Sequence, residues 1–362
     1  MFFTHIDALA HIDVHERTWE NVMGRILVDD LIPIIVIMAL GWCLGFKWKG
    51  LSKPFFDDNG RQALNKFVLN IALPAALFAS IAKASRQLFV KDGVLTLISL
   101  IGTTALFMLC YYLDRWMFKR NKMEAAICAL VAGSPTIGFL GFAVLDPIYG
   151  NTTNTNLVIG IISIVVNAVT IPIGVSLIES YQDDLARKNG TLKTVDENGK
   201  KIHRGAGWSI LRACKKPVAL SPILAVIWVL IGIPVPSWLA PIFARVAKAN
   251  SGVAVLAAGV ALAATGTFAF NGEIIWNVFY RLILMPGILV GVGILCGMHP
   301  ATSSLLGMLA LGTGLPPAMS GVIISSNNNC YVKESTSTLA ICTVLFALTA
   351  LGWLALLPAG HL

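Results

Sequence analysis

The chain has 362 residues, of which 56% are hydrophobic and only 13% are charged. Soluble domains carry about 25% charged residues, so this composition excludes an ordinary soluble protein and predicts a polytopic membrane protein surrounded by lipid. Lysine and arginine outnumber aspartate and glutamate by 27 to 19, which gives a net charge of +8. The basic residues lie in short segments between apolar runs, as membrane topology requires, and they therefore do not indicate nucleic-acid binding.

Residues 1–28 precede the first apolar run, and we expect an amphipathic segment at the membrane interface. Apolar residues at helical spacing are mixed there with His, Asp and Glu. The segment lacks the basic start and apolar core of a signal peptide. His5, His11 and His15 would suit a metal ion, but a solvated helix face is the favoured interpretation. We expect no metal and no cofactor, and the seven cysteines, none in a CxxC pair, are interpreted as free thiols.

Ten apolar runs approach the ~20 residues that a helix needs to cross a bilayer. The longest break between them, 181–216, follows the fifth run. It divides the chain into a first five-helix repeat at 29–180 and a second at 217–362. The runs are 29–46, 63–82, 93–113, 124–146, 155–178, 217–233, 249–268, 275–296, 302–325 and 336–357.

Lysine and arginine predict the orientation of the spans, because cytosolic loops are enriched in both. They are concentrated in segment 181–216 and in the short loops that follow the first and third runs. This imbalance predicts a plasma-membrane protein with a cytosolic loop at 181–216 and both termini outside the cell. Within the loop, Asn198-Gly199 between polar flanks resembles a hairpin turn.

Helix-breaking residues occur at matched places in the two halves. Each half contains five spans, an odd number, so the halves must run in opposite directions, which is the inverted-repeat plan of many transporters. The fourth run breaks at Pro135 and the ninth at Pro316-Pro317, an offset of 316 − 135 = 181 residues. A single proline would be explained by a simple kink, but a matched pair flanked by glycines favours two broken helices that cross.

The crossing predicts a site for an anion. Broken helices are tolerated at membrane depth only where the free backbone faces protein or a water-filled cavity. The amino termini of half-helices carry partial positive charge and free N–H groups, which suit a carboxylate. The substrate-binding candidates at the two breaks are Ser134, Pro135, Thr136, Gly138, Pro316, Pro317 and Ser320. Ser134, Thr136 and Ser320 would equally serve as caps of the broken helices.

Three further polar residues lie inside apolar runs, where polar groups are costly and usually functional. Asn70, one turn before Pro74, is the strongest side-chain candidate, and a helix–helix hydrogen bond is its equal alternative. For Asn167 a bond to a neighbouring helix is slightly favoured over substrate binding. Arg281 would bind a carboxylate bidentately, but snorkelling to the interface or pairing with Glu273 is the favoured interpretation.

Four stretches in this order resemble the auxin efflux carrier family of permeases. They are "LNKFVLNIALPAALFASIAK" (64–83), "PTIGFLGFAVL" (135–145), "YRLILMPG" (280–287) and "LPPAMSGVIISS" (315–326). The resemblance implies an all-α fold of ten transmembrane helices in two inverted five-helix repeats, with helices 4 and 9 broken, similar to bile-acid symporters and auxin carriers. It also implies elevator-type alternating access, and bacterial members resemble permeases of malate, malonate and other organic acids.

The chain departs from the family pattern at the fourth span. Thr136 stands where an asparagine is usual, and Ala143 stands where a second proline is usual. A hydroxyl offers one donor where an amide offers two, so the hydrogen bonds to substrate would differ from those of the family.

The acidic residues indicate no coupling ion, because a proton or sodium site normally has a carboxylate at mid-membrane. Asp146, Glu179, Glu273 and Glu334 instead fall at span ends. Coupling to H⁺ or Na⁺ therefore stays open. The chain has no Ser-His-Asp set, HExxH motif or glycine-rich phosphate loop, so we do not expect an enzyme.

The favoured function is a secondary transporter of small organic anions, namely mono- or dicarboxylates such as malate or malonate. Its alternatives are a sodium-coupled symporter of larger amphipathic acids and a transporter-like sensor. A homodimer is suggested by analogy alone.

Overall fold

The computed structural model describes residues 32–47, 54–82, 93–150, 152–190, 215–232, 235–236, 238–264, 269–298 and 304–357. The predicted amphipathic segment, its three histidines and the Asn198-Gly199 turn lie outside these ranges. The described residues are predominantly helical and include no strand, which confirms the all-α prediction for them.

Several helices are long and apolar enough to cross a membrane, as expected of a multi-pass protein. Within the described ranges there are five: Asp58–Ala79, Val94–Met117, Asn154–Lys188, Gly272–Leu295 and Val332–Leu356. Shorter apolar helices occupy Ile32–Gly45, Ala219–Ile231, Gly252–Ala264 and Ser304–Gly314.

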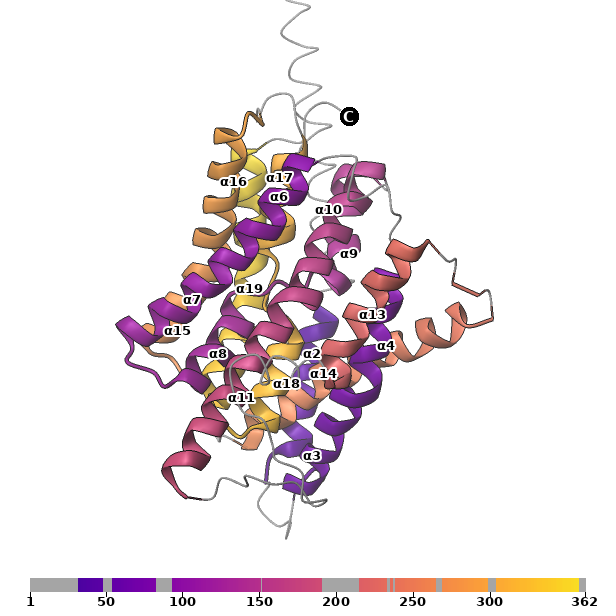
Figure 1. The fold of residues 1–362 in the computed structure, drawn as a ribbon. Helices are drawn as coiled ribbons and strands as arrows, with labels where there is room; N and C mark the ends of the chain where they lie inside the picture. The colour runs from indigo at the N-terminus through magenta and orange to yellow at the C-terminus, as the bar shows by residue number, and fades with distance from the viewer. Residues whose placement is uncertain are drawn as a thin grey trace, which may run out of the picture.

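The described residues form helical segments that follow one another along the chain (Figure 1). Before residue 190 they are α2 (Ile32–Gly45), α3 (Asp58–Phe67), η2 (Val68–Ala72), α4 (Leu73–Ile81), α6 (Gly93–Leu97), η3 (Ile98–Gly102), α7 (Thr103–Met117), α8 (Lys122–Ala132), α9 (Ile137–Tyr149), α10 (Thr153–Ile164), η4 (Val165–Thr170) and α11 (Ile171–Lys188). After residue 214 they are α13 (Pro217–Ile231), α14 (Ala240–Ala264), α15 (Gly272–Phe279), η5 (Tyr280–Leu284), α16 (Met285–Leu295), α17 (Ser304–Gly314), α18 (Met319–Asn327) and α19 (Val332–Leu356).

The η segments are π-helical turns inside longer rods, and three of them precede a proline. Pro74, Pro172 and Pro286 each stand at the start of the α-helix that follows η2, η4 or η5. A proline has no N–H and clashes with the carbonyl four residues earlier, so a wider turn before it relieves the helix. The freed carbonyl of Leu282, four residues before Pro286, accepts a hydrogen bond from Trp353 Nε1 at 3.0 Å.

The helices form two groups that lie side by side (Figure 1). The first group, which we call the α14 group, consists of α2, the α3–η2–α4 rod, α13 and α14, and α14 packs along both α2 and α4. The second, the crossover group, contains α6 to α11 and α15 to α19. Helices α18 and α10 of the crossover group contact the α3–η2–α4 rod, so the boundary between the groups passes beside α18.

Glycines let two helices of the α14 group touch. A Cβ built on Gly259 of α14 would lie 2.1 Å from the carbonyl oxygen of Met38, and one on Gly41 of α2 would lie 2.2 Å from that of Leu256. Only glycine fits at both positions, as in close helix pairs within membranes.

One predicted boundary is wrong. The loop was expected to begin at residue 181, but α11 continues as a helix to Lys188. The sequence changes there from an apolar run to an amphipathic pattern with acidic residues followed by Arg187 and Lys188, and basic residues in a last turn complement the helix dipole. The apolar run ends before the helix does, so hydropathy placed the start of the loop several residues before the end of α11.

Candidate functional site

The two interrupted helices meet at their breaks. Helix α8 ends at Ala132 and α9 begins at Ile137, while α17 ends at Gly314 and α18 begins at Met319. Pro135 and Pro317 form an isolated antiparallel bridge between the two breaks. The halves α8 and α18 lie in the lower part of the molecule, and α9 and α17 lie in the upper part (Figure 1).

Two backbone hydrogen bonds hold the crossing. The Thr136 N–H donates to the Pro316 carbonyl at 3.0 Å, and the Ala318 N–H donates to the Ser134 carbonyl at 2.9 Å. Pro135 and Pro317 therefore sit at the position of an antiparallel pair where neither residue's own N–H is needed. The prolines break both helices without leaving this pairing short of a donor. The partner of Pro135 is Pro317, one residue beyond the match counted from the sequence.

The amino ends of α9 and α18 both point into the crossing and lack a side-chain cap. Their N-cap residues, Thr136 and Ala318, make no side-chain capping bond. Helices α8, α10 and α15, in contrast, are capped by Asn121, Thr152 and Asn271. Thr136 thus does not serve the capping role considered for it. The uncapped first turns, which include Gly138 and the buried Ser320, present amide groups suited to an anion.

Arg281 lies at the crossing, and its favoured interpretation from the sequence is wrong. Its side chain is fully buried. Its Nε donates to the Leu315 carbonyl at 2.9 Å, and its Nη1 donates to the Ala132 carbonyl at 3.3 Å and contacts Met285 Sδ at 3.2 Å. It neither snorkels nor pairs with Glu273. The π turn η5 and the burial that packing imposes could not be read from the apolar run.

The guanidinium changes the charge of the crossing. Arg281 binds carbonyls at the carboxyl ends of α8 and α17, where helix dipoles are negative, and so neutralises both. The positive amino ends of α9 and α18 are left without such compensation. In addition, Nη2 of Arg281 is buried without a hydrogen-bond partner among the described residues. The centre of the molecule therefore favours an anionic guest.

A hydroxyl cluster flanks the crossing on the side of η4. Ser134 Oγ lies 3.2 Å from Thr170 Oγ1, which in turn donates to the Val166 carbonyl at 2.7 Å. Thr170 was missed by the sequence analysis, because a threonine in an apolar run gives no distinct signal. Asn167, in the same π turn, donates to the carbonyl and hydroxyl of Ser163 at 2.8 and 3.1 Å, so its amide is engaged by its own helix.

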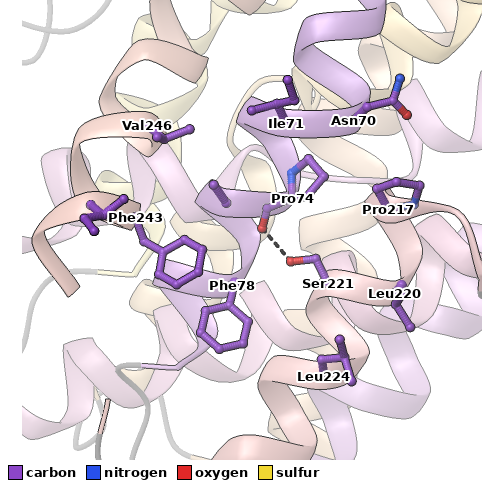
Figure 2. Close-up of a pocket in the computed structure, with 12 residues that line it drawn as sticks. Asn70, Ile71, Pro74, Phe78, Pro217, Leu220, Ser221, Leu224, Phe243 and Val246 are labelled. Carbon is purple, nitrogen blue, oxygen red and sulfur yellow. Dashed lines mark hydrogen bonds between the residues drawn. The ribbon is translucent and has the colours of Figure 1, made fainter. Parts of the chain in front are cut away.

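Asn70 lies elsewhere. It is exposed on η2 and borders a groove of about 580 Å³ between η2, α4, α13 and α14, none of whose lining residues comes from the crossing. Figure 2 shows this groove, where Ser221 Oγ donates to the Pro74 carbonyl at 2.5 Å between apolar side chains that include Phe78 and Phe243. The structure thus does not bring Asn70 together with the other candidates.

Two polar residues of α3 that the sequence did not indicate as site residues contact the end of α18. Arg61 Nη1 donates to the carbonyl and hydroxyl of Ser326, both at 3.0 Å, and its Nη2 donates to Asn329 Oδ1 at 2.8 Å. Asn65 Nδ2 donates to Ser326 Oγ at 2.9 Å. These bonds join the α14 group to the crossover group. Arg61 was assigned to a basic loop, because it precedes the second apolar run.

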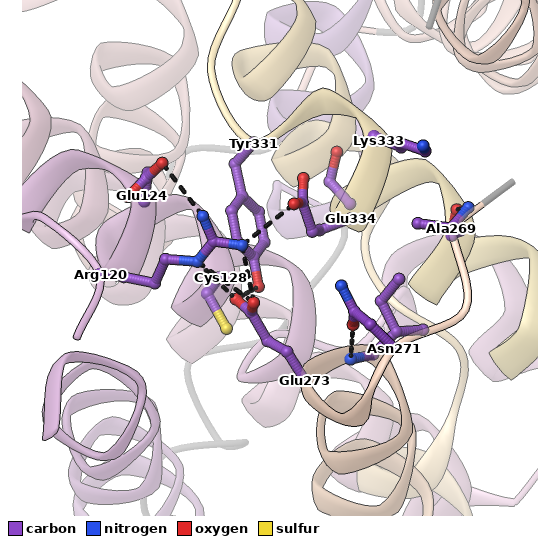
Figure 3. Close-up of polar contacts among 12 residues, drawn as sticks. Arg120, Glu124, Cys128, Ala269, Asn271, Glu273, Tyr331, Lys333 and Glu334 are labelled. Carbon is purple, nitrogen blue, oxygen red and sulfur yellow. Dashed lines mark hydrogen bonds and ion pairs between the residues drawn. The ribbon is translucent and has the colours of Figure 1, made fainter. Parts of the chain in front are cut away.

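A partly buried ion-pair network joins α8, α15 and α19 of the crossover group (Figure 3). Arg120 Nη2 contacts Glu273 Oε2 at 2.7 Å and Glu334 Oε1 at 3.0 Å, and its Nη1 contacts Glu124 at 3.3 Å. The hydrogen bonds that Arg120 donates to Glu273 raise the pKa of the guanidinium above its ordinary value. Tyr331 donates to Glu273 Oε1 at 2.5 Å.

Neither a metal-type cluster nor a disulfide occurs in the part of the chain that the structure describes. Among those residues, no group of three or more His, Cys, Asp or Glu side chains could hold a metal ion. The six cysteines in the described ranges form no disulfide: Cys43, Cys110, Cys128, Cys296, Cys330 and Cys342.

The chain is similar to known membrane transporters over almost its whole length. Residues 26–354 match the model of a family described as membrane transport protein. The chain is 46% identical over 332 residues to "Uncharacterized transporter YfdV" of Escherichia coli K12, covering 92% of this chain and 98% of that protein. The proteins of the same name from Escherichia coli O157:H7 and Shigella flexneri match to the same extent.

Proposed function

Since the chain belongs to the family of membrane transport proteins, we propose that it is a secondary transporter of small organic anions, with malate and malonate as the first candidates. One observation carries the choice of an anion. At the crossing, Arg281 neutralises the carboxyl ends of α8 and α17, so the amino ends of α9 and α18 are left to receive a carboxylate.

The proposed movement follows from the two groups of helices. The crossover group, with its bound anion, would move against the α14 group in an elevator-type cycle within two inverted five-helix repeats. This is supported by the position of the boundary, where Arg61 and Asn65 of the α14 group reach across to α18. The proposal retains the expected orientation in the plasma membrane, with loop 181–216 in the cytosol and both termini outside.

The alternative of a sodium-coupled symporter is less well supported. Sodium would be coordinated by the carbonyls that unwound helices leave free. At this crossing, the carbonyls of Ala132 and Leu315 accept hydrogen bonds from Arg281. A side-chain cation thus occupies the place that a metal cation would take, and coordination of sodium beside it would be opposed by charge repulsion.

Uptake into proteoliposomes tests the proposed function. Purified protein is expected to accumulate labelled malate or malonate, and Pro135→Ala combined with Pro317→Ala is expected to lower the rate at least about tenfold, equal to about 1.4 kcal/mol, because the helix ends lose their fixed geometry. Pro147→Ala, at an exposed proline inside α9, is the matched control and should transport as the wild type does. Equal rates for the wild type and the double variant would contradict the proposed site.

Sodium dependence is a separate prediction from the same vesicles. Replacing external sodium by choline at constant ionic strength is expected to leave the initial rate of malate uptake unchanged, because Arg281 already neutralises the free carbonyls. Uptake that requires sodium would favour the symporter of larger amphipathic acids. Competition of indole-acetate or a bile acid with malate for uptake would then identify such a symporter.

A further inference from the structure

Asp114 is a buried carboxyl group without a hydrogen-bond partner. It lies on α7, and its side chain is 1% exposed. Among the described residues, neither of its carboxylate oxygens has a hydrogen-bond partner. An ionised carboxylate in such a place is strongly unfavourable unless it is paired or neutralised. The arrangement therefore requires either a proton or a cation that binds there.

The surroundings of Asp114 are rich in negative charge. Glu273 and Cys128 face it, and Arg120 is the cation in reach. Arg120 is already shared by three other carboxylates, among which Glu273 has the shortest contact, at 2.7 Å. The charged and titratable groups of this cluster are Cys110 on α7, Arg120 in the following loop, Glu124 and Cys128 on α8, Glu273 on α15, and Tyr331 and Glu334 at the start of α19.

The charge count favours a proton. Four carboxyl groups, including Asp114, gather around the single guanidinium of Arg120 in this cluster. Two carboxylates that face one another cannot both stay ionised at low cost, and one of them then retains its proton. Glu273 accepts hydrogen bonds from Arg120 and Tyr331, whereas neither oxygen of Asp114 has such a partner, so the proton belongs on Asp114.

A chain of polar contacts leads from this carboxyl pair toward the crossing. Glu273 accepts from Tyr331, whose hydroxyl accepts from Asn277 Nδ2 at 3.0 Å, and Asn277 Oδ1 accepts from Cys128 Sγ at 3.3 Å. Cys128 lies on α8 four residues before the helix ends at Ala132 beside the crossing, about 6 Å along the helix. The carboxyl pair and the proposed anion site thus belong to the same group of helices and would move together.

We propose that Asp114, facing Glu273, is a proton-binding site that couples proton movement to the transport of the anion. This inference rests on the proposed function. A proton from water on one side converts the Asp114 carboxylate to the carboxylic acid and returns to water on the other side, after the crossover group has moved. The proton offsets one negative charge of the transported anion, and a proton gradient becomes a driving force.

Infrared difference spectra of the reconstituted full chain test the site without any substrate. Between alkaline and acidic buffer, the wild type is expected to gain the carbonyl band of a buried carboxylic acid, which Asp114→Asn should lack. Asparagine has the shape of the neutral acid, so the variant is expected to fold. Asp184→Asn, which removes a half-exposed carboxylate paired with Lys122, is the control and should retain the band. A spectrum that Asp114→Asn leaves unchanged would overturn the proposal.

Vesicles that contain a pH-sensitive dye test the coupling. In the wild type, labelled malate is expected to enter together with protons, and an inward proton gradient should speed uptake at least about fivefold, whereas Asp114→Asn should show no response to the gradient. Malate uptake without proton movement in the wild type, or an equal response in Asp114→Asn, would overturn the coupling while leaving the proposed function intact. If the wild type moves neither malate nor malonate, the proposed function fails, and the infrared result alone decides the proton site. If Asp114→Asn does not fold, Glu273→Gln takes its place in both assays. Without the facing carboxylate, the carbonyl band of Asp114 is expected only in more acidic buffer and the response of uptake to the gradient should weaken, whereas an unchanged band and response would overturn the proposal.

Discussion

Replacing Arg281 with methionine is expected to reduce malate uptake at least about 100-fold, which corresponds to about 2.7 kcal/mol of lost stabilisation. The change removes the guanidinium that neutralises the carboxyl ends of α8 and α17. It also leaves two buried carbonyls without donors, each at a cost of about 1–3 kcal/mol. The variant should therefore be less stable as well as inactive, which uptake into proteoliposomes and thermal melting in detergent would measure together.

Two further variants separate the role of charge from that of fold. Arg281→Lys retains the cation but not the planar fork, and an intermediate rate is expected because an ammonium group does not bind both carbonyls in the same geometry. Arg115→Met removes an exposed arginine that lies over the Tyr111 ring, and it should behave as the wild type does. A rate for Arg281→Met equal to that of Arg115→Met would rule out a role for this guanidinium in transport.

The second large effect concerns folding. Gly259→Ala is expected to destabilise the protein by about 3 kcal/mol or more, the upper end of what overpacking costs, because its Cβ would lie 2.1 Å from the Met38 carbonyl oxygen. The backbones of α2 and α14 would have to separate. The measurement is the yield of monodisperse protein and its melting temperature in detergent.

Gly252 provides a control on the same helix. A Cβ built at Gly252 meets nothing within 4 Å, so Gly252→Ala should raise stability slightly, because alanine is the better helix former by up to about 1 kcal/mol. Equal melting temperatures for the two alanine variants would show that α2 and α14 do not touch at Gly259.

The backbone features of the site were predictable from the sequence, and the side chains were predicted less well. Proline and glycine act locally, since they remove a donor or loosen a helix wherever they stand, so Pro135 and Pro317 revealed both breaks. The matched spacing then predicted that the breaks meet, and the backbone bonds at Thr136 and Ala318 confirm it.

Side-chain roles depend on which face of a helix is buried and on the partners brought there by other helices. Arg281 and Asn70 illustrate this, since both occur in apolar runs shortly before a proline. One is fully buried at the crossing, and the other is exposed at a groove. A π turn rotates the helix that follows it. Counting residues at the spacing of a regular α-helix therefore does not predict which way a side chain beyond the turn points. Asp114 was overlooked because it lies close to the end of an apolar run, where carboxylates are ordinary.

The backbone pairing between the two breaks has a consequence for energetics. Two main-chain hydrogen bonds and one guanidinium fasten four helix ends to one another, so the cradle has little freedom to open or tighten. A carrier built on such a cradle would present the same binding surface to each compartment and hold its cargo with equal affinity on both. The combined gradients of cargo and protons would then set the direction of net flux. Uptake and export would be the forward and reverse directions of one transport cycle.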